Sequence, residues 1–294
     1  MGKLIRIITT DGAVLASSVN STDIVSEIER IHKTSAVITA GLGRLATGAV
    51  LISSMMKEEG NSVTLRIAGG GPAGALLAVS DKDCRVKAYP QNPVVELPLN
   101  SKGKLDVGGA VGTDGLLSVI RDTGRGEPHT GYCNIVSGEI GDDITSYFAS
   151  SEQIPTVCAL GVLVNPDLTC KAAGGIFIQL LPGADDATID KLEKNLSEMR
   201  SVSSMVDMGL TPIEMLKEAL KGFEIEVIDE IDAKYQCDCS EERVERALIS
   251  LSAEELDKMI EEEEQISVQC HFCNKSYTFS KEKLILLKKM QKRD

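Results

Sequence analysis

Two close pairs of cysteines are the residues of this 294-residue sequence best suited to chemistry. One residue separates Cys237 from Cys239, two residues separate Cys270 from Cys273, and residues 240–269 lie between the pairs. Thiolate sulfur is a soft ligand, and four thiolates at the corners of a tetrahedron suit Zn²⁺. The spacing therefore predicts one four-thiolate zinc site per chain. His271 stands between two of the ligands and is expected to be a bystander, because four sulfurs already complete the set.

This cysteine set leaves the role of the zinc open. A Cys-x-Cys pair also places two thiols where oxidation can join them, which is unusual for a purely structural zinc site. The metal is therefore either inert and structural or part of a thiol sensor. Structural disulfides are disfavoured because nothing else in the chain suggests export. Unrelated buried cysteines are disfavoured because two close pairs fall near one end of the chain.

The other candidate reactive residues do not suggest an enzyme. Cys84, Cys133, Cys158 and Cys170 are scattered through apolar strand-like runs and are expected to be small core residues. The chain has three histidines and assembles no Ser-His-Asp or Cys-His grouping. We therefore expect no catalytic residue.

Composition favours a soluble protein of two domains, possibly joined by a linker, with 43% hydrophobic and 26% charged residues. A net charge of −13, 3% aromatics and no tryptophan argue against a nucleic-acid partner. No signal peptide is visible, and the apolar run 36–56 contains Arg44 and several small polar residues. We expect a buried helix there, no membrane partner and a cytoplasmic location.

Turn residues separate short apolar runs throughout residues 1–181, which predicts an N-terminal α/β domain, sandwich-like, with mixed sheets and helices. The Asp-Gly turn at Asp11 predicts a hairpin. The glycine run 69–74 is expected to be a hairpin turn, because no Gly-Lys-Ser/Thr follows it. The predicted strands are 4–9, 13–19, 62–68, 75–80, 85–89, 116–122, 157–164 and 170–181. The predicted helices begin near Ser21, Ser35 and Glu139, and acidic residues at the start of the last complement its dipole.

The composition changes at residue 182, and residues 182–232 are predicted to form a helical, Met-rich linker. Helices are expected at 185–206 and 211–221 with a break at Gly209, and a short strand at 223–231. Four of the nine methionines fall here: Met199, Met205, Met208 and Met215. Methionine suits both core packing and promiscuous apolar binding, and its content alone favours core packing.

Residues 233–294 are predicted to form a small zinc-binding domain. Ser240 and Ser252 each begin a helix-compatible stretch, and Ser252 with Glu255 forms a capping box. A further helix is expected at 280–292. A domain of about 60 residues buries too small a core to be stable by itself, so a metal would supply the missing stability. Removal of the metal should therefore unfold the domain. The predicted fold class is therefore α+β in three parts.

The sequence resembles the redox-regulated heat-shock chaperones (the HslO family) over nearly its full length. The resemblance rests on the two cysteine pairs and on a central signature in which Gly141 replaces a more frequent alanine. The signature comprises Asn92-Pro93, Gly112-Thr113-Asp114-Gly115-Leu116, Tyr132, Gly138-Glu139-Ile140-Gly141-Asp142-Asp143, Tyr147-Phe148 and Ser151-Glu152-Gln153-Ile154-Pro155.

The resemblance implies a function that composition does not show. In such proteins the reduced, zinc-bound form is inactive. Oxidation forms disulfides within each close pair, here Cys237–Cys239 and Cys270–Cys273, zinc leaves, and the zinc domain and linker unfold. The exposed apolar surface then holds unfolding client proteins without ATP, and the active form is a homodimer. The helical segment 185–221 is the candidate for the region that loosens, and its four methionines are candidate client contacts.

Two rival functions differ in class from this one. A zinc-ribbon-like nucleic-acid module would need the basic and aromatic surface that this composition lacks. A thiol–disulfide oxidoreductase using Cys270 and Cys273 would need a thioredoxin-like setting, which the surrounding sequence does not provide.

Overall fold

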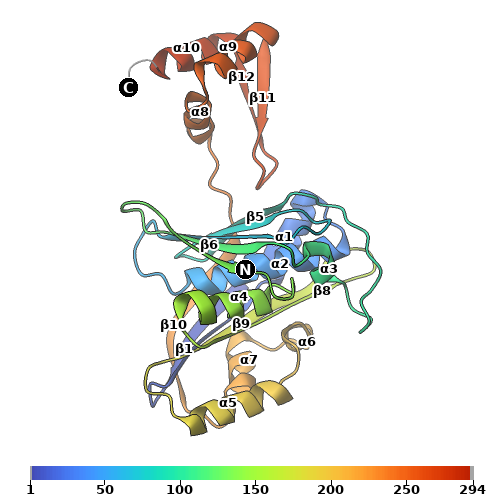
Figure 1. Ribbon diagram of the computed structural model, residues 1–294, viewed down its shortest axis with the longest axis vertical. Coiled ribbons are helices and arrows are strands. Elements are labelled where there is room, and N and C mark those ends of the chain that lie inside the picture. Colours follow the sequence, from blue (N-terminus) through green and yellow to red (C-terminus); the bar gives the residue numbers. More distant parts are fainter. Residues whose placement is uncertain (1, 292–294) are drawn as a thin grey trace. The chain divides into compact units, whose positions relative to one another are not determined.

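The computed structural model describes residues 2–291 and consists of two compact units, Met1–Gln236 and Cys237–Asp294 (Figure 1). Each unit is described by itself. The mixed α+β class predicted from the sequence is confirmed. By compactness, the residues of the predicted linker lie within the first unit, and the second unit begins at the first cysteine of the pairs.

The first unit is built on a ten-stranded sheet with the order β7-β6-β3-β4-β5-β10-β1-β2-β9-β8. Neighbouring strands are antiparallel except β10 and β5, which pair in parallel through Lys234 and Tyr235. The strands predicted within residues 1–181 are all present. The bounds are β1 (Gly2–Thr9), β2 (Val14–Asn20), β3 (Ser62–Ala68), β4 (Leu76–Asp81), β5 (Arg85–Pro90), β6 (Leu116–Asp122), β7 (His129–Asn134), β8 (Thr156–Val164), β9 (Cys170–Leu180) and β10 (Ile225–Tyr235).

The β1–β2 hairpin shows how local sequence sets this sheet. Gly12 has φ 70°, a left-handed conformation that glycine adopts without strain. The Asp11 carboxylate accepts hydrogen bonds from the backbone of Ala13 at 3.0 Å and from the Thr9 hydroxyl at 2.5 Å. The predicted Asp-Gly turn is therefore confirmed, and it fixes the register of β1 against β2.

The main core of the first unit surrounds the helices α1 (Thr22–His32) and α2 (Ala36–Ser53). Figure 1 shows both between the β5–β6 side of the sheet and the β8–β9 side. By length and composition α2 could cross a membrane, but 89% of its apolar window is buried inside the protein. The predicted buried helix is confirmed. Shorter helices border this core: α3 (Val107–Val111), α4 (Gly141–Tyr147) and a π-helical turn at Phe148–Glu152.

A second core lies on the other face of β1, β2 and β9, under the helices α5 (Asp186–Glu198), α6 (Val202–Asp207) and α7 (Pro212–Ala219). The prediction of one helix over 185–206 is wrong. Met199 has an extended backbone (φ −69°, ψ 139°), and the Ser201 side chain accepts from the Ser204 N–H to cap α6. A local cap therefore interrupts a helical pattern that the sequence carries without a break.

The second unit pairs a two-stranded hairpin, β11 (Gln265–Gln269) and β12 (Ser276–Ser280), with three helices. These are α8 (Glu241–Ile249), α9 (Ala253–Glu262) and α10 (Lys281–Gln291). The predicted caps at Ser240 and Ser252 are both formed. The last residue of the predicted C-terminal helix, Lys292, lies outside the described residues. The core holds six buried residues: Leu248, Ile266, Tyr277, Phe279, Leu284 and Leu287.

Candidate metal centre

Two local structures present the four cysteines. Cys237 and Cys239 lie on the segment that leads to α8, where Asp238 between them forms an ion pair with Arg243 of that helix. Cys270 and Cys273 occupy the turn between β11 and β12. The Cys270 N–H donates to the Lys275 carbonyl at 2.9 Å, which closes this turn. A helix start and a hairpin turn therefore hold the two pairs.

The four sulfurs converge. All four Sγ atoms lie within 4.8 Å of one another, and no other such group of histidine, cysteine and acidic residues occurs among residues 2–291. The Cys237 and Cys270 Sγ atoms are 3.7 Å apart, and those of Cys239 and Cys273 are 3.4 Å apart. A tetrahedral zinc site with Zn–S bonds of about 2.3 Å has S···S edges of about 3.8 Å. The donor set and its spacing therefore fit Zn²⁺, and His271 is not part of the cluster.

A tyrosine completes the hydrogen bonding around the cluster. The Tyr277 hydroxyl, on β12, donates to Cys239 Sγ at 3.1 Å, and the Lys275 Nζ lies 4.8 Å from the Tyr277 ring centroid. This bond to the sulfur raises the pKa of the tyrosine. Sequence analysis did not single out Tyr277. The available signal was the alternation Ser-Tyr-Thr-Phe-Ser after the second pair, which places Tyr277 and Phe279 on the buried face of a strand.

The thiols of the cluster differ in acidity. Burial opposes ionisation of Cys239, yet hydrogen bonds from Tyr277 and the neighbouring thiols outweigh it and lower the pKa of Cys239 to about 7. Burial raises the pKa of Cys237 and of Cys273. The geometry therefore favours a thiolate at Cys239 before any metal charge is added, and a metal ion would favour the thiolate form of all four.

The remaining four cysteines lie singly in the first unit. Cys84, Cys133 and Cys158 are buried and Cys170 is half-buried, as expected for core residues. Burial raises the pKa of Cys84 to about 12 and that of both Cys133 and Cys170 to about 11, and it also raises that of Cys158. These thiols are poor nucleophiles near neutral pH, because the thiolate is the reactive form.

The four methionines of the predicted linker differ in how deeply they are buried. Met205 and Met215 are fully buried in the second core, and Met199 is partly buried against it. Met208 is 60% exposed, and its sulfur accepts from Arg200 at 3.6 Å. Core packing therefore describes Met205 and Met215 in this conformation, and Met208 alone of the four offers a large exposed surface.

The acidic residues at the start of α4 are structural, as predicted. The buried Asp143 carboxylate accepts from the backbone N–H groups of Val136 at 2.8 Å and Ile140 at 3.0 Å. Glu139 forms an ion pair with Arg44 of α2. These contacts hold the loop before α4 against the main core.

Comparisons with known proteins all find similarity to one protein family over nearly the full length of the chain. The family model described as "Hsp33 protein" matches residues 2–280. The 33 kDa chaperonin of Lachnoclostridium phytofermentans is 48% identical over 281 residues, 96% of each chain. That of Bacillus subtilis is 46% identical over 284 residues, 97% of each. The crystal structure of the 33 kDa chaperonin (heat shock protein 33 homolog) from Thermotoga maritima superposes with a TM-score of 0.89 at 36% identity, covering 99% of both chains.

Proposed function

The chain belongs to the Hsp33 family of chaperones, and we propose that it is a redox-regulated holdase. It is inactive when reduced and zinc-bound. When oxidised, it keeps unfolding proteins from aggregating without ATP. The observation that carries this proposal is the cluster of four thiols in a unit whose core holds six buried residues. So small a core makes the fold of that unit depend on its sulfurs.

In the reduced state Cys237, Cys239, Cys270 and Cys273 hold one Zn²⁺ per chain. The metal supplies a cross-link between the segment before α8 and the β11–β12 turn, and it keeps the sulfurs as thiolates. Structural zinc contributes about 10–16 kcal/mol to the folding of small zinc-finger peptides. Loss of a contribution of this size exceeds the stability expected of so small a unit.

Oxidation removes the ligand set. For each disulfide, two thiolate sulfurs form the S–S bond and give two electrons to the oxidant. Hydrogen peroxide takes up these electrons with two protons and leaves as two water molecules. We assign the disulfides Cys237–Cys239 and Cys270–Cys273, as the family resemblance implies.

The choice of pairing decides whether the unit opens. Two sulfur contacts join cysteines of different pairs, at 3.7 Å from Cys237 to Cys270 and at 3.4 Å from Cys239 to Cys273. Disulfides at those distances would keep the hairpin tied to the segment before α8. Disulfides within each close pair release the two segments from one another. Only the second pairing therefore turns oxidation into unfolding.

Unfolding of the linker then supplies apolar surface for clients. Helices α5–α7 cover one face of β1, β2 and β9 with their own apolar residues, Met205 and Met215 among them. If they detach, both sides of this contact become accessible. The residues of the covered sheet face are Ile7, Ala13, Val14, Ala16, Ala172, Ile176 and Ile178. β10 follows α7 directly and leads to Cys237, so the chain itself connects the linker to the switch.

The partners follow from this chemistry. Clients are unfolded or partly unfolded proteins, recognised by exposed apolar surface instead of a sequence motif. We expect a homodimer in the active state, a cytoplasmic location and a role in the response to oxidative stress. We expect no catalysis, and no nucleic-acid or membrane partner.

The test measures zinc content and suppression of thermal aggregation on one preparation, before and after peroxide at raised temperature. We expect one zinc per chain when reduced, lost as holdase activity appears. Peptide mapping should recover Cys237–Cys239 and Cys270–Cys273. A Cys170→Ser variant serves as the control, because it removes a half-buried thiol outside the cluster and should switch normally. Zinc retained after peroxide, with unchanged aggregation, would contradict the proposal.

A further inference from the structure

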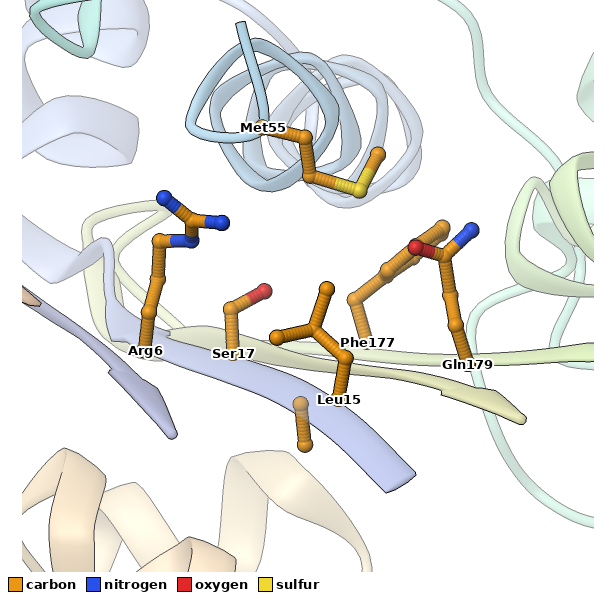
Figure 2. A pocket seen from close by; sticks show the side chains of 7 residues that line it. Arg6, Leu15, Ser17, Met55, Phe177 and Gln179 are labelled. Atoms are coloured by element: carbon orange, nitrogen blue, oxygen red, sulfur yellow. The ribbon is translucent and has the colours of Figure 1, made fainter. Parts of the chain in front are cut away.

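Two pockets of the first unit differ in what they can hold. The pocket over β1, β2 and β9, with Met55 above it in Figure 2, encloses about 10 Å³, which is room for about one water molecule. The other pocket encloses about 260 Å³, close to the smallest small-molecule sites, which start at about 300 Å³. Three segments far apart in the sequence line it, namely α2, the loop before α4 and residues 100–105. Its polar lining residues are Arg44, Asn100, Ser101, Lys102, Lys104 and Glu139.

A tight turn holds the two lysines of the larger pocket. The Asn100 side-chain carbonyl accepts from the backbone N–H groups of Lys102 and Lys104, both at 3.0 Å. The backbone closes the same turn, because the Asn100 N–H donates to the Lys104 carbonyl at 2.8 Å and the Gly103 N–H donates to the Asn100 carbonyl at 2.9 Å. Gly103 has φ 69°, a conformation that glycine adopts without strain. The turn is therefore stabilised by its own hydrogen bonds, and both lysines reach the pocket from a preorganised backbone.

The charge that lines the pocket is positive and incompletely paired. Lys102 and Lys104 form no ion pair with any of residues 2–291. Arg44 forms an ion pair with Glu139, which compensates the charge of that carboxylate. Three cations and one carboxylate leave two net positive charges at the pocket, in a chain whose net charge is −13. An anion of two charges would balance this lining.

Hydrogen-bond donors also outnumber acceptors in the lining. A guanidinium carries several N–H donors, and the contact with Glu139 is the one hydrogen bond of the Arg44 side chain within residues 2–291. Neither the Asn100 side-chain NH₂ group nor the Ser101 hydroxyl has a partner in that range. Water satisfies such donors but brings no charge to the two lysines. A group with several acceptor oxygens and two negative charges satisfies both.

We propose that this pocket binds a phosphate group. A phosphate monoester carries a charge of about −1.5 to −2 at pH 7 and has three strong acceptor oxygens. These oxygens accept from the Nζ atoms of Lys102 and Lys104 and from the Arg44 guanidinium. The Asn100 NH₂ group and the Ser101 hydroxyl donate to the same group. The pocket lies within the first unit, so the site stands or falls separately from the redox switch.

The Glu139 carboxylate distinguishes two sources of this phosphate. It lines the same pocket and is 38% exposed, so it is open to a further hydrogen bond. The phosphate ester of a small hydroxylated compound offers a hydroxyl that donates to this carboxylate, whereas inorganic phosphate leaves the carboxylate to water. One such hydrogen bond is worth about two- to tenfold in affinity. The ester should therefore bind more tightly than inorganic phosphate.

The experiment uses the full-length, reduced protein labelled with ¹⁵N-glycine. The Gly103 amide signal reports occupancy, a Gly103→Asn variant assigns it, and Gly209 of the predicted linker is the internal reference. Inorganic phosphate, propyl phosphate, glycerol 3-phosphate and glycerol are titrated at one ionic strength, so that charge screening stays constant. We expect a saturable shift of the Gly103 signal with the three phosphates and none with glycerol. Tightest binding of glycerol 3-phosphate identifies a hydroxylated ester as the ligand, whereas equal binding of all three phosphates identifies inorganic phosphate.

Variants then locate the binding energy. Lys102→Gln combined with Lys104→Gln should weaken phosphate binding by about tenfold or more, because it removes two charge-assisted hydrogen bonds. Arg44 is kept, since its ion pair with Glu139 also holds the loop before α4. Lys217→Gln is the matched control, because Lys217 is an exposed lysine of α7 that does not line the pocket. The proposal is overturned if no phosphate shifts the Gly103 signal, if glycerol shifts it equally, or if the double variant binds like the parent protein. Equal weakening by Lys217→Gln would also overturn it, because binding would then follow the overall charge.

Discussion

The two units of this protein use the same side chain in opposite ways. In the first unit four cysteines lie singly in apolar surroundings, and burial raises the pKa of each. In the second unit four cysteines meet within 4.8 Å, and the pKa of Cys239 falls to about 7. The thiol itself does not differ, so its surroundings decide whether it behaves as a hydrocarbon or as a ligand and nucleophile.

The cores of the two units also differ, in size and in how far each unit depends on its thiols. The first unit buries two large apolar clusters, one around α2 and one beneath α5–α7. The second unit has six buried core residues around its hairpin. A large core can lose one thiol and persist, whereas a small core tied by four sulfurs depends on them. The comparison teaches that a redox switch is best placed where the sulfurs carry a large share of the folding free energy.

Metal removal should produce the largest difference in stability between the two units. Treating the reduced protein with a chelator should unfold the second unit and leave the sheet of the first unit intact, because only the former depends on the thiol cluster. Amide hydrogen exchange read by mass spectrometry would show loss of protection in α8–α10 and retained protection in α2. Equal protection of both units after complete zinc removal would show that the small core suffices by itself.

A substitution in the linker should open the first unit without touching a thiol. Met205 is fully buried, so Met205→Ala should cost about 2–5 kcal/mol. Met208 is 60% exposed, so Met208→Ala should change stability by about 0.5 kcal/mol or less. If the α5–α7 contact hides the client surface, Met205→Ala should show partial holdase activity while it still retains zinc. Chemical unfolding and aggregation assays of the two variants check this, and identical behaviour would contradict the assigned surface.

Sequence reasoning succeeded where the signal is local. The Asp-Gly turn at Gly12, the caps at Ser240 and Ser252 and the buried helix α2 each follow from a few adjacent residues or one periodic run. The grouping of the four cysteines also follows from spacing, since close pairs already bring two ligands together.

Sequence reasoning failed where contacts between distant segments determine the structure. The bond from Tyr277 to Cys239 exists because the hairpin folds back on the first pair. One missed feature has a local cause, because the Ser201 side chain caps α6 and so ends the preceding helical pattern at Met199.

The raised pKa of Cys84 predicts a pH dependence that is confined to the first unit. Burial raises this pKa from an ordinary value of 9.0 to about 12. Above pH 9 the unfolded chain loses the thiol proton and the folded chain keeps it, so stability is full below pH 9 and falls as pH rises towards 12. The slope for this group is about 1.4 kcal/mol per pH unit. Urea unfolding of the parent and of Cys84→Ala from about pH 8 to about pH 11 should show the steeper decline in the parent, and parallel curves would contradict the assignment.

The smallest effect concerns the tyrosine that bonds to the cluster. Tyr277→Phe removes the hydroxyl that donates to Cys239 at 3.1 Å and keeps the ring in the core. Outer-shell hydrogen bonds of this kind are worth about 10–100-fold in metal affinity, so zinc should bind more weakly while the second unit still folds. Competition with a colorimetric chelator measures the affinity. Tyr235→Phe is the control, because its hydroxyl bonds to the Ala88 carbonyl in the first unit and should leave zinc affinity unchanged. A larger loss of zinc affinity for Tyr235→Phe than for Tyr277→Phe would mean that zinc binding depends on the sheet of the first unit. That result would contradict the view that zinc binding depends on the second unit alone.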